Sequence, residues 1–144
     1  MGNLGIDHLT APTDFDERVL DALRQWRTPD QHASPLAGLV VHQQALAAGQ
    51  RSPRQAANHL LMLALAQLGS EHADDARLIE LRFLDAVPVD QVASRLGFAE
   101  STVYQKQRQA VQRLAAVLWG MESRTQHDRW MRISARLPAP ALRD

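Results

Sequence analysis

The stretch that decides the fold is VDQVASRLGFAESTVYQKQRQAVQRL, which runs from Val89 to Leu114. Its apolar spacing predicts a short helix, a turn at Gly97 and a longer helix that begins near Glu100. Glycine suits the turn because it adopts a positive φ without steric cost. Two helices joined in this way are typical of a helix-turn-helix, so the stretch raises the question of whether it binds DNA.

Apolar residues in this stretch mark the faces that pack the two helices together. The first helix has Val92, Ala93 and Leu96 on its inner face, and the small Ala93 lets the second helix approach closely. The second helix has one apolar stripe, made of Val103, Ala110, Val111 and Leu114. The polar and charged side chains left outside are the candidates for DNA binding: Glu100, Ser101, Thr102, Tyr104, Gln105, Lys106, Arg108 and Arg113.

The chemistry of these outer residues suits DNA recognition. The Gln105 amide can form two hydrogen bonds with adenine, and Lys106 can contact guanine or phosphate. Hydroxyl groups at the start of the helix can bind bases or phosphates, whereas Arg108 and Arg113 lie further along and suit phosphates. The alternative interpretation of this face is a solvated helix surface with no ligand.

Helical patterns also fill the rest of the chain. Capping residues and apolar spacing predict further helices near residues 14–28, 34–48, 52–68, 71–85 and 121–137. Gly120 is expected to end or kink the second helix of the helix-turn-helix. No alternating strand pattern is present, so the predicted fold class is all-α, a helical bundle.

Composition narrows the classes of function. The chain has no cysteine, and its six histidines lack metal-ligand spacing, so no metal site is expected. No glycine-rich phosphate loop or paired-acid pattern occurs, which predicts no cofactor and no enzymatic activity. The apolar run His59–Leu68 is far shorter than the roughly 20 residues that cross a bilayer. With no signal peptide visible, we expect a soluble cytoplasmic protein without a membrane partner.

The formal net charge is zero, but it is unevenly distributed. Residues 1–86 hold seven arginines against eleven acids, a net charge of −4, whereas residues 87–118 and 119–144 each carry +2. Contact with phosphates requires local positive charge, so the second half of the chain has the right sign for DNA.

The segment Ala76–Leu118, ARLIELRFLDAVPVDQVASRLGFAESTVYQKQRQAVQRLAAVL, resembles region four of bacterial sigma factors and the related LuxR-type domains. The match lies in LRFLDAVPVDQVASRLG, in STV and in the spacing from Ala110 to Leu114. The resemblance implies that the second helix binds promoter DNA. By position, it implies base contacts for Glu100, Ser101, Thr102, Tyr104 and Gln105, with Arg108 as a phosphate contact.

Three features depart from that family. Ala99 replaces the usual Ser or Thr at the helix cap, Glu100 places an acid near the phosphates, and Gln107 occupies a commonly apolar position. We also find no counterpart of the region with which sigma factors melt promoter DNA, so a complete sigma factor is not expected.

A second resemblance concerns LWGMES at residues 118–123 and ARLPAP at residues 135–140. These segments are similar to parts of N-terminal helix-turn-helix modules that precede signalling ATPase domains of the STAND class.

The two resemblances imply two alternative functions. One is a transcriptional regulator that binds double-stranded DNA, in which a homodimer would extend the contact with DNA because one unit contacts only a half-site. The other is a protein-interaction or signalling module with a downstream ATPase domain as its partner.

We expect three segments: an N-terminal helical region for bracing or dimerisation at residues 1–70, the helix-turn-helix at residues 71–118, and a C-terminal helix with a linker or tail at residues 119–144. The chain has three tryptophans, Trp26, Trp119 and Trp130. They are expected to anchor the packing, unless one lies on a partly exposed face and marks a dimer seam.

Overall fold

The structure, a computed structural model, describes residues 10–28, 33–49 and 52–136. In chain order, its elements are α2 (Phe15–Arg24), α3 (Val40–Ala47), α4 (Pro53–Glu71), α5 (Ala73–Ile79), the π-helical turn η1 (Glu80–Leu84), α6 (Val89–Leu96) and α7 (Glu100–Arg136). No strand occurs among the described residues, and the predicted all-α fold class is confirmed. The expected tail from Leu137 onward lies outside the described residues.

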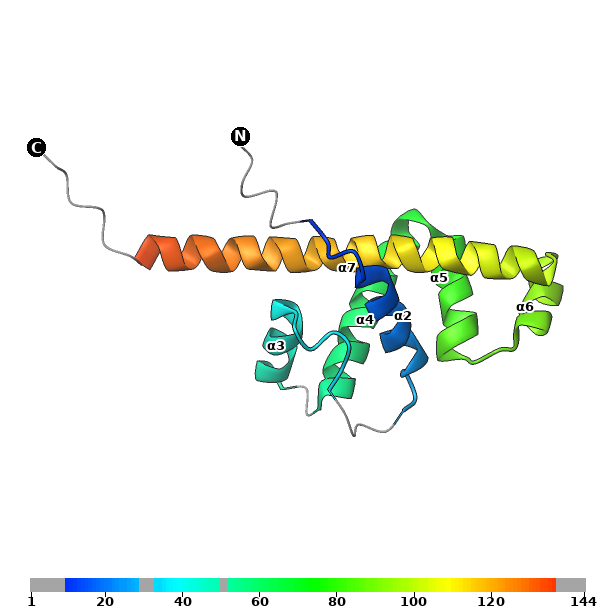
Figure 1. Cartoon of the computed structure of the whole chain (residues 1–144), viewed down its shortest axis with the longest axis horizontal. Coiled ribbons are helices and arrows are strands. Elements are labelled where there is room, and N and C mark those ends of the chain that lie inside the picture. Colours follow the sequence, from blue (N-terminus) through cyan, green and yellow to red (C-terminus); the bar gives the residue numbers. More distant parts are fainter. Residues whose placement is uncertain (1–9, 29–32, 50–51, 137–144) are drawn as a thin grey trace, which may run out of the picture.

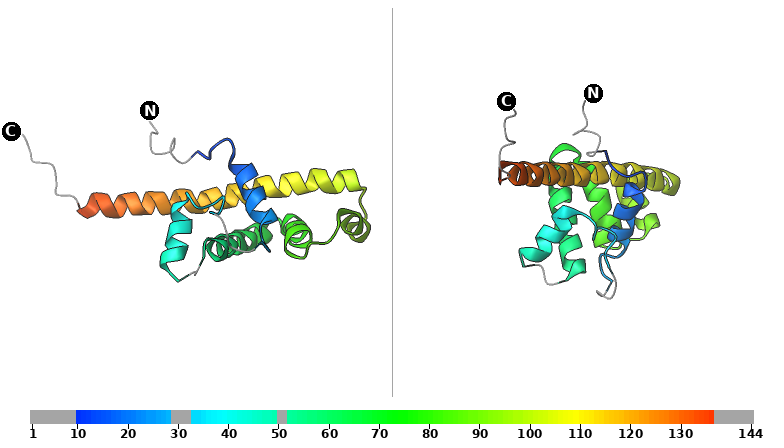
Figure 2. Two further views of the ribbon diagram at one scale, coloured as in Figure 1. Left: turned by 60° about the horizontal axis from the view of Figure 1, so that its bottom comes forward. Right: turned by 60° about the vertical axis from the view of Figure 1, so that its left-hand side comes forward.

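The 37-residue helix α7 is the axis of the molecule. At 1.5 Å per residue it is about 55 Å long. Figure 1 shows the shorter helices gathered around the first part of α7, with α6 beside its beginning and the other end projecting from the body. The further views in Figure 2 show the same projection.

Gly120 neither ends α7 nor separates it from a further helix, so that prediction is wrong. A glycine inside a helix costs about 1 kcal/mol relative to alanine. Leu118 and Glu122, on either side of Gly120, are each at most 1% exposed. Their packing favours a continuous helix by more than the glycine disfavours it.

One large hydrophobic core joins α2, α3, α4, α5 and α7. The buried face of α2 contains Phe15, Val19 and Leu23, as its apolar spacing predicts. The Phe15 ring meets the Trp119 ring of α7 edge-on, with 5.2 Å between centroids. The three segments expected from the sequence therefore contact one another, and the roles assigned to them stay predictions.

Helix α3 begins at Val40, later than the predicted start at Ser34. The Ser34 hydroxyl accepts a hydrogen bond from the Leu36 N–H at 3.1 Å and shapes a turn instead. The first N–H groups of α3, those of Val40 and Val41, each donate to the Glu122 carboxylate of α7 at 3.0 Å. The cap of α3 thus comes from a residue about 80 positions away, which local sequence patterns do not reveal.

Helix α4 begins as predicted, with the Ser52 hydroxyl accepting a hydrogen bond from the Gln55 N–H at 3.1 Å. It continues through Gly69 to Glu71, beyond the predicted end near residue 68. The helix predicted for residues 71–85 is divided. The backbone leaves the helical region at His72, with φ −138° and ψ 73°, and α5 then leads into η1.

Candidate nucleic-acid interface

The helix-turn-helix consists of α6, a turn and the beginning of α7. A second core cluster contains Val92 and Ala93 of α6 and Val103 of α7, which are all at most 6% exposed. Gly97 has a φ of 75°, and the Phe98 N–H donates to the Ala93 carbonyl at 2.9 Å. This bond closes a Schellman-type helix end. The predicted turn glycine and the predicted inner face of these helices are confirmed.

Helix α7 begins at Glu100, as predicted, and the exposed Glu100 side chain lies in its first turn. Ala99 precedes it without a side-chain oxygen, and only its carbonyl takes part, accepting the Val103 N–H at 3.1 Å. The predicted inner stripe is buried at every position, namely Val103, Ala110, Val111 and Leu114. Burial of this stripe fixes the rotation of α7, so the opposite face points outward.

The outward face of α7 carries Ser101, Gln105 and Arg108, all exposed. Their spacing of four and three residues places them in one row. None of the three has a hydrogen bond or ion pair with another side chain in the part of the chain that the structure describes. Gln112 continues the row four residues beyond Arg108 and is exposed. Gln112 is not among the residues predicted from the sequence, although the same helical spacing identifies it.

Other predicted residues lie on the flank of α7 that faces α5 and α6. The Lys106 ammonium lies 4.9 Å from the centroid of the Phe98 ring, which is a cation–π distance. Arg113 forms an ion pair with Asp75 of α5 at 2.5 Å. Thr102 is half-buried. The eight predicted residues thus surround the beginning of α7 rather than forming one surface.

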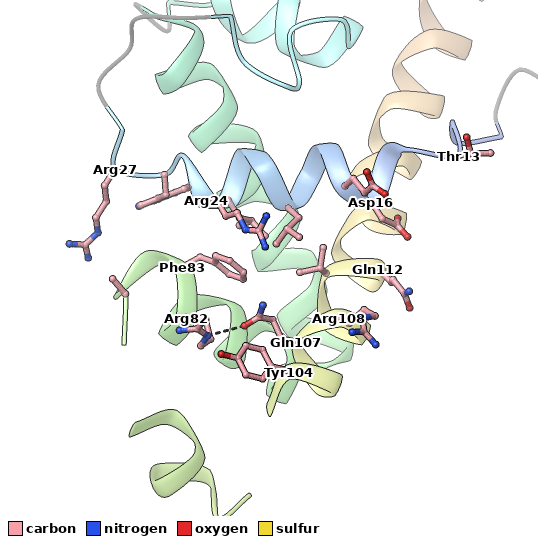
Figure 3. Close-up of a pocket in the computed structure, with 16 residues that line it drawn as sticks. Thr13, Asp16, Arg24, Arg27, Arg82, Phe83, Tyr104, Gln107, Arg108 and Gln112 are labelled. Atoms are coloured by element: carbon pink, nitrogen blue, oxygen red, sulfur yellow. Dashed lines mark hydrogen bonds between the residues drawn. The ribbon is translucent and has the colours of Figure 1, made fainter. Parts of the chain in front are cut away.

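A groove of about 860 Å³ lies between α2, η1 and α7 (Figure 3). Tyr104, 48% exposed, lines the groove together with Arg108. Across from them, three further arginines that were not predicted line the groove, Arg24 at the end of α2, Arg27 in the turn after α2 and Arg82 in η1, together with the acids Asp16 and Glu17 of α2. These arginines add positive charge beside the outward row, and only the folded chain brings them there.

Arg82 connects η1 to α7. Its Nε donates to the Gln107 side-chain oxygen at 2.8 Å, and its Nη1 donates to the Val87 carbonyl at 2.9 Å. The resemblance to sigma region four places an apolar residue at position 107, and Arg82 explains why a polar one is accommodated. The pair holds the beginning of α7 against the preceding turn.

The described residues form neither a metal-binding cluster nor a membrane-spanning helix. Within the described ranges, no three His, Asp or Glu side chains are grouped so that they would hold a metal ion. None of the described helices is long and apolar enough to cross a membrane.

Fold and surface together define an all-helical protein with a helix-turn-helix whose outer face is polar. A family model described as "ECF sigma factor" matches residues 29–119, and the chain belongs to this family. It is a family of transcription factors rather than enzymes. The match begins before Ala76, where we placed the resemblance to sigma region four, and so includes α3 and α4.

No curated protein and no solved structure matches the chain. The resemblance to modules of STAND-class ATPases finds no counterpart in the family match and stays a prediction.

Proposed function

We propose that the chain is a cytoplasmic, sequence-specific DNA-binding protein that acts in transcription and inserts the beginning of α7 into the major groove. Membership of a sigma factor family supports this function, and it implies that the chain acts together with RNA polymerase. Homodimerisation, which would extend the contact to two half-sites, stays a prediction.

The observation that carries the proposal is the outward row of Ser101, Gln105 and Arg108. The three side chains are exposed, and none is engaged by another described side chain. The buried stripe beneath them holds the helix rigidly, as base contacts require. A glutamine amide can pair with adenine, and an arginine can pair with guanine or a phosphate.

The surroundings of the row favour an anionic ligand. Arg24, Arg27 and Arg82 lie across the groove from Arg108. The Lys106 ammonium extends over Phe98 on the other flank. Positive charge on both sides of the outward row suits the two phosphate backbones that border a major groove. Glu100 is the one acid in the first turn of α7. The groove beside it is lined by four arginines against two acids, Asp16 and Glu17, so positive charge exceeds negative charge there.

The test is the salt dependence of binding to labelled duplexes of random sequence, measured by fluorescence anisotropy with the full chain. We expect the wild-type affinity to fall steeply with salt, because phosphate contacts release counterions. Lys106→Ala with Arg108→Ala should weaken binding and reduce the salt slope by about two.

The matched control is Arg129→Ala with Arg132→Ala, which removes the same charge from the far end of α7. The salt slope of this control should differ from the wild-type slope by no more than about 0.5, because salt screens charges that lie far from the DNA. Absence of salt-dependent binding by the wild type, or an equal loss in the control, would contradict the proposal.

A further inference from the structure

The last part of α7, residues 127–136, projects from the helical body (Figure 1). It carries three large exposed apolar side chains: Trp130 is 62% exposed, Met131 50% and Ile133 48%. The expectation that Trp130 anchors the packing is therefore wrong, and the alternative, that an exposed tryptophan marks a dimer seam, stays a prediction. The family match ends at residue 119, so the shared function of the family does not account for this segment.

Ile133, with Trp130 beside it at a spacing of three residues, continues a face of α7 that is already used for packing. Trp119 and Gln126 lie on that face, where Trp119 contacts Phe15 and the Gln126 amide donates to Glu122 at 2.6 Å. Seven residues separate Trp119 from Gln126, and Ile133 follows after seven more. A seven-residue repeat keeps side chains on one side of a helix. The face that packs against the body therefore extends past the body without a partner.

Positive charge borders this exposed face. Arg129, Arg132 and Arg136 follow one another at spacings of three and four residues, which places them in a second row. None of them forms an ion pair with any residue that the structure describes. Residues 124–136 hold four arginines and one aspartate, a net charge of +3. The negative end of the helix dipole accounts for Arg136 in the last turn, but its influence fades beyond that turn.

We propose that residues 127–136 dock an acidic amphipathic helix of another protein. Its apolar stripe would cover Trp130 and Ile133, and its carboxylates would face Arg129, Arg132 and Arg136. Such pairing follows the rule that apolar seams give affinity and flanking charges select the partner. A second copy of this chain is a poorer occupant, because it brings the same arginines and only one acid, Asp128, to the contact.

A designed peptide tests the docking surface. The probe is a fluorescein-labelled helix of about 21 residues, three heptads with leucine at a and d and glutamate at e and g. A matched peptide has lysine in place of every glutamate. We expect the full-length chain to bind the acidic peptide at least about tenfold more tightly than the basic one.

Two variants identify the residues involved. Trp130→Ser with Ile133→Ser should weaken binding of the acidic peptide at least about tenfold, because anchors at a small interface carry most of its affinity. Arg129→Glu, Arg132→Glu and Arg136→Glu together should reverse the preference between the two peptides. All five side chains are exposed, so circular dichroism should show wild-type helix content.

Three results would overturn the proposal. The first is a failure of either peptide comparison: the wild type binds both peptides equally, or the Trp130→Ser, Ile133→Ser variant binds the acidic peptide as tightly as the wild type does. The second is wild-type self-association in sedimentation that the same variant abolishes, since a second copy would then be the occupant. The third is binding to vesicles of phosphatidylcholine and phosphatidylglycerol, lost in that variant, while neither peptide binds.

Discussion

Arg108 and Arg113 are five positions apart on α7 and have different surroundings. Arg108 is exposed beside the groove without a charged partner among the described residues, whereas Arg113 is paired with Asp75. The charge of Arg113 is already neutralised by Asp75, and its side chain is held toward α5. The two residues therefore form a matched pair for separating contact with DNA from net charge.

We expect Arg108→Ala to lower the salt slope of duplex binding by about one, and Arg113→Ala to lower it by clearly less. The measurement is fluorescence anisotropy of a single duplex over a range of salt. Each variant removes one positive charge, so charge alone predicts equal effects. Equal slopes for the two variants would contradict this account. They would show that the orientation of α7, which its buried stripe fixes, does not decide which side chains contact DNA.

Glu122 shows how one side chain connects two elements. Its carboxylate accepts the first two N–H groups of α3 and is 1% exposed. Glu122→Ala would leave both donors without an acceptor, and we expect it to lower the free energy of unfolding by about 2–4 kcal/mol. Glu122→Gln keeps one acceptor oxygen and should cost less. Urea unfolding measures both, and hydrogen exchange should show faster opening of α3 in the alanine variant.

Replacing a glycine by alanine should have opposite effects on stability in the turn after α6 and inside α7. Gly97 has a φ of 75° in open space, so Gly97→Ala should destabilise the protein by about 1 kcal/mol through backbone strain alone. Gly120 lies inside α7, and a Cβ there would meet only the end of the flexible Arg124 side chain at 3.4 Å. Gly120→Ala should therefore stabilise the protein by about 0.5–1 kcal/mol.

Thermal unfolding of both alanine variants gives the comparison. A stabilised Gly97→Ala variant would show that the turn does not require the left-handed conformation. A destabilised Gly120→Ala variant would show that α7 is interrupted at this position, as the sequence had led us to expect.

At the scale of the whole molecule, α7 passes through both hydrophobic clusters. Val103 lies in the cluster of the helix-turn-helix, while Leu118 lies in the large core with the helices of the N-terminal half. A helix that belongs to two clusters couples their stability. We therefore expect a single urea transition that coincides in tryptophan fluorescence and in far-ultraviolet circular dichroism.

Leu61→Ala in α4 tests this coupling at a distance from the helix-turn-helix. Leu61 is fully buried, and its truncation should lower the free energy of unfolding by about 2–5 kcal/mol. The free energy of opening that hydrogen exchange reports for the amides of α6 should then fall by the same amount. Two separate transitions, with α6 unaffected, would instead support the three segments expected from the sequence.

The features predicted correctly from the sequence are those that depend on local patterns. The inner faces of the helix-turn-helix, the turn at Gly97 and the cap at Ser52 each follow from spacing or from the conformational preference of one residue. The features that were missed depend on distant contacts. Glu122 caps a helix far away in sequence, and Arg82 supports Gln107 across a turn. Only the folded chain brings such partners together.

The central claim is that the beginning of α7 contacts the bases of duplex DNA. Its most direct test is binding-site selection from a random duplex library, performed in parallel with the wild-type chain and with Gln105→Ala. We predict that the wild type enriches one sequence motif. The variant should enrich the same motif with a single relaxed position, where discrimination against other bases falls about tenfold. Failure of the wild type to enrich any motif, or an unchanged motif in the variant, would contradict the account.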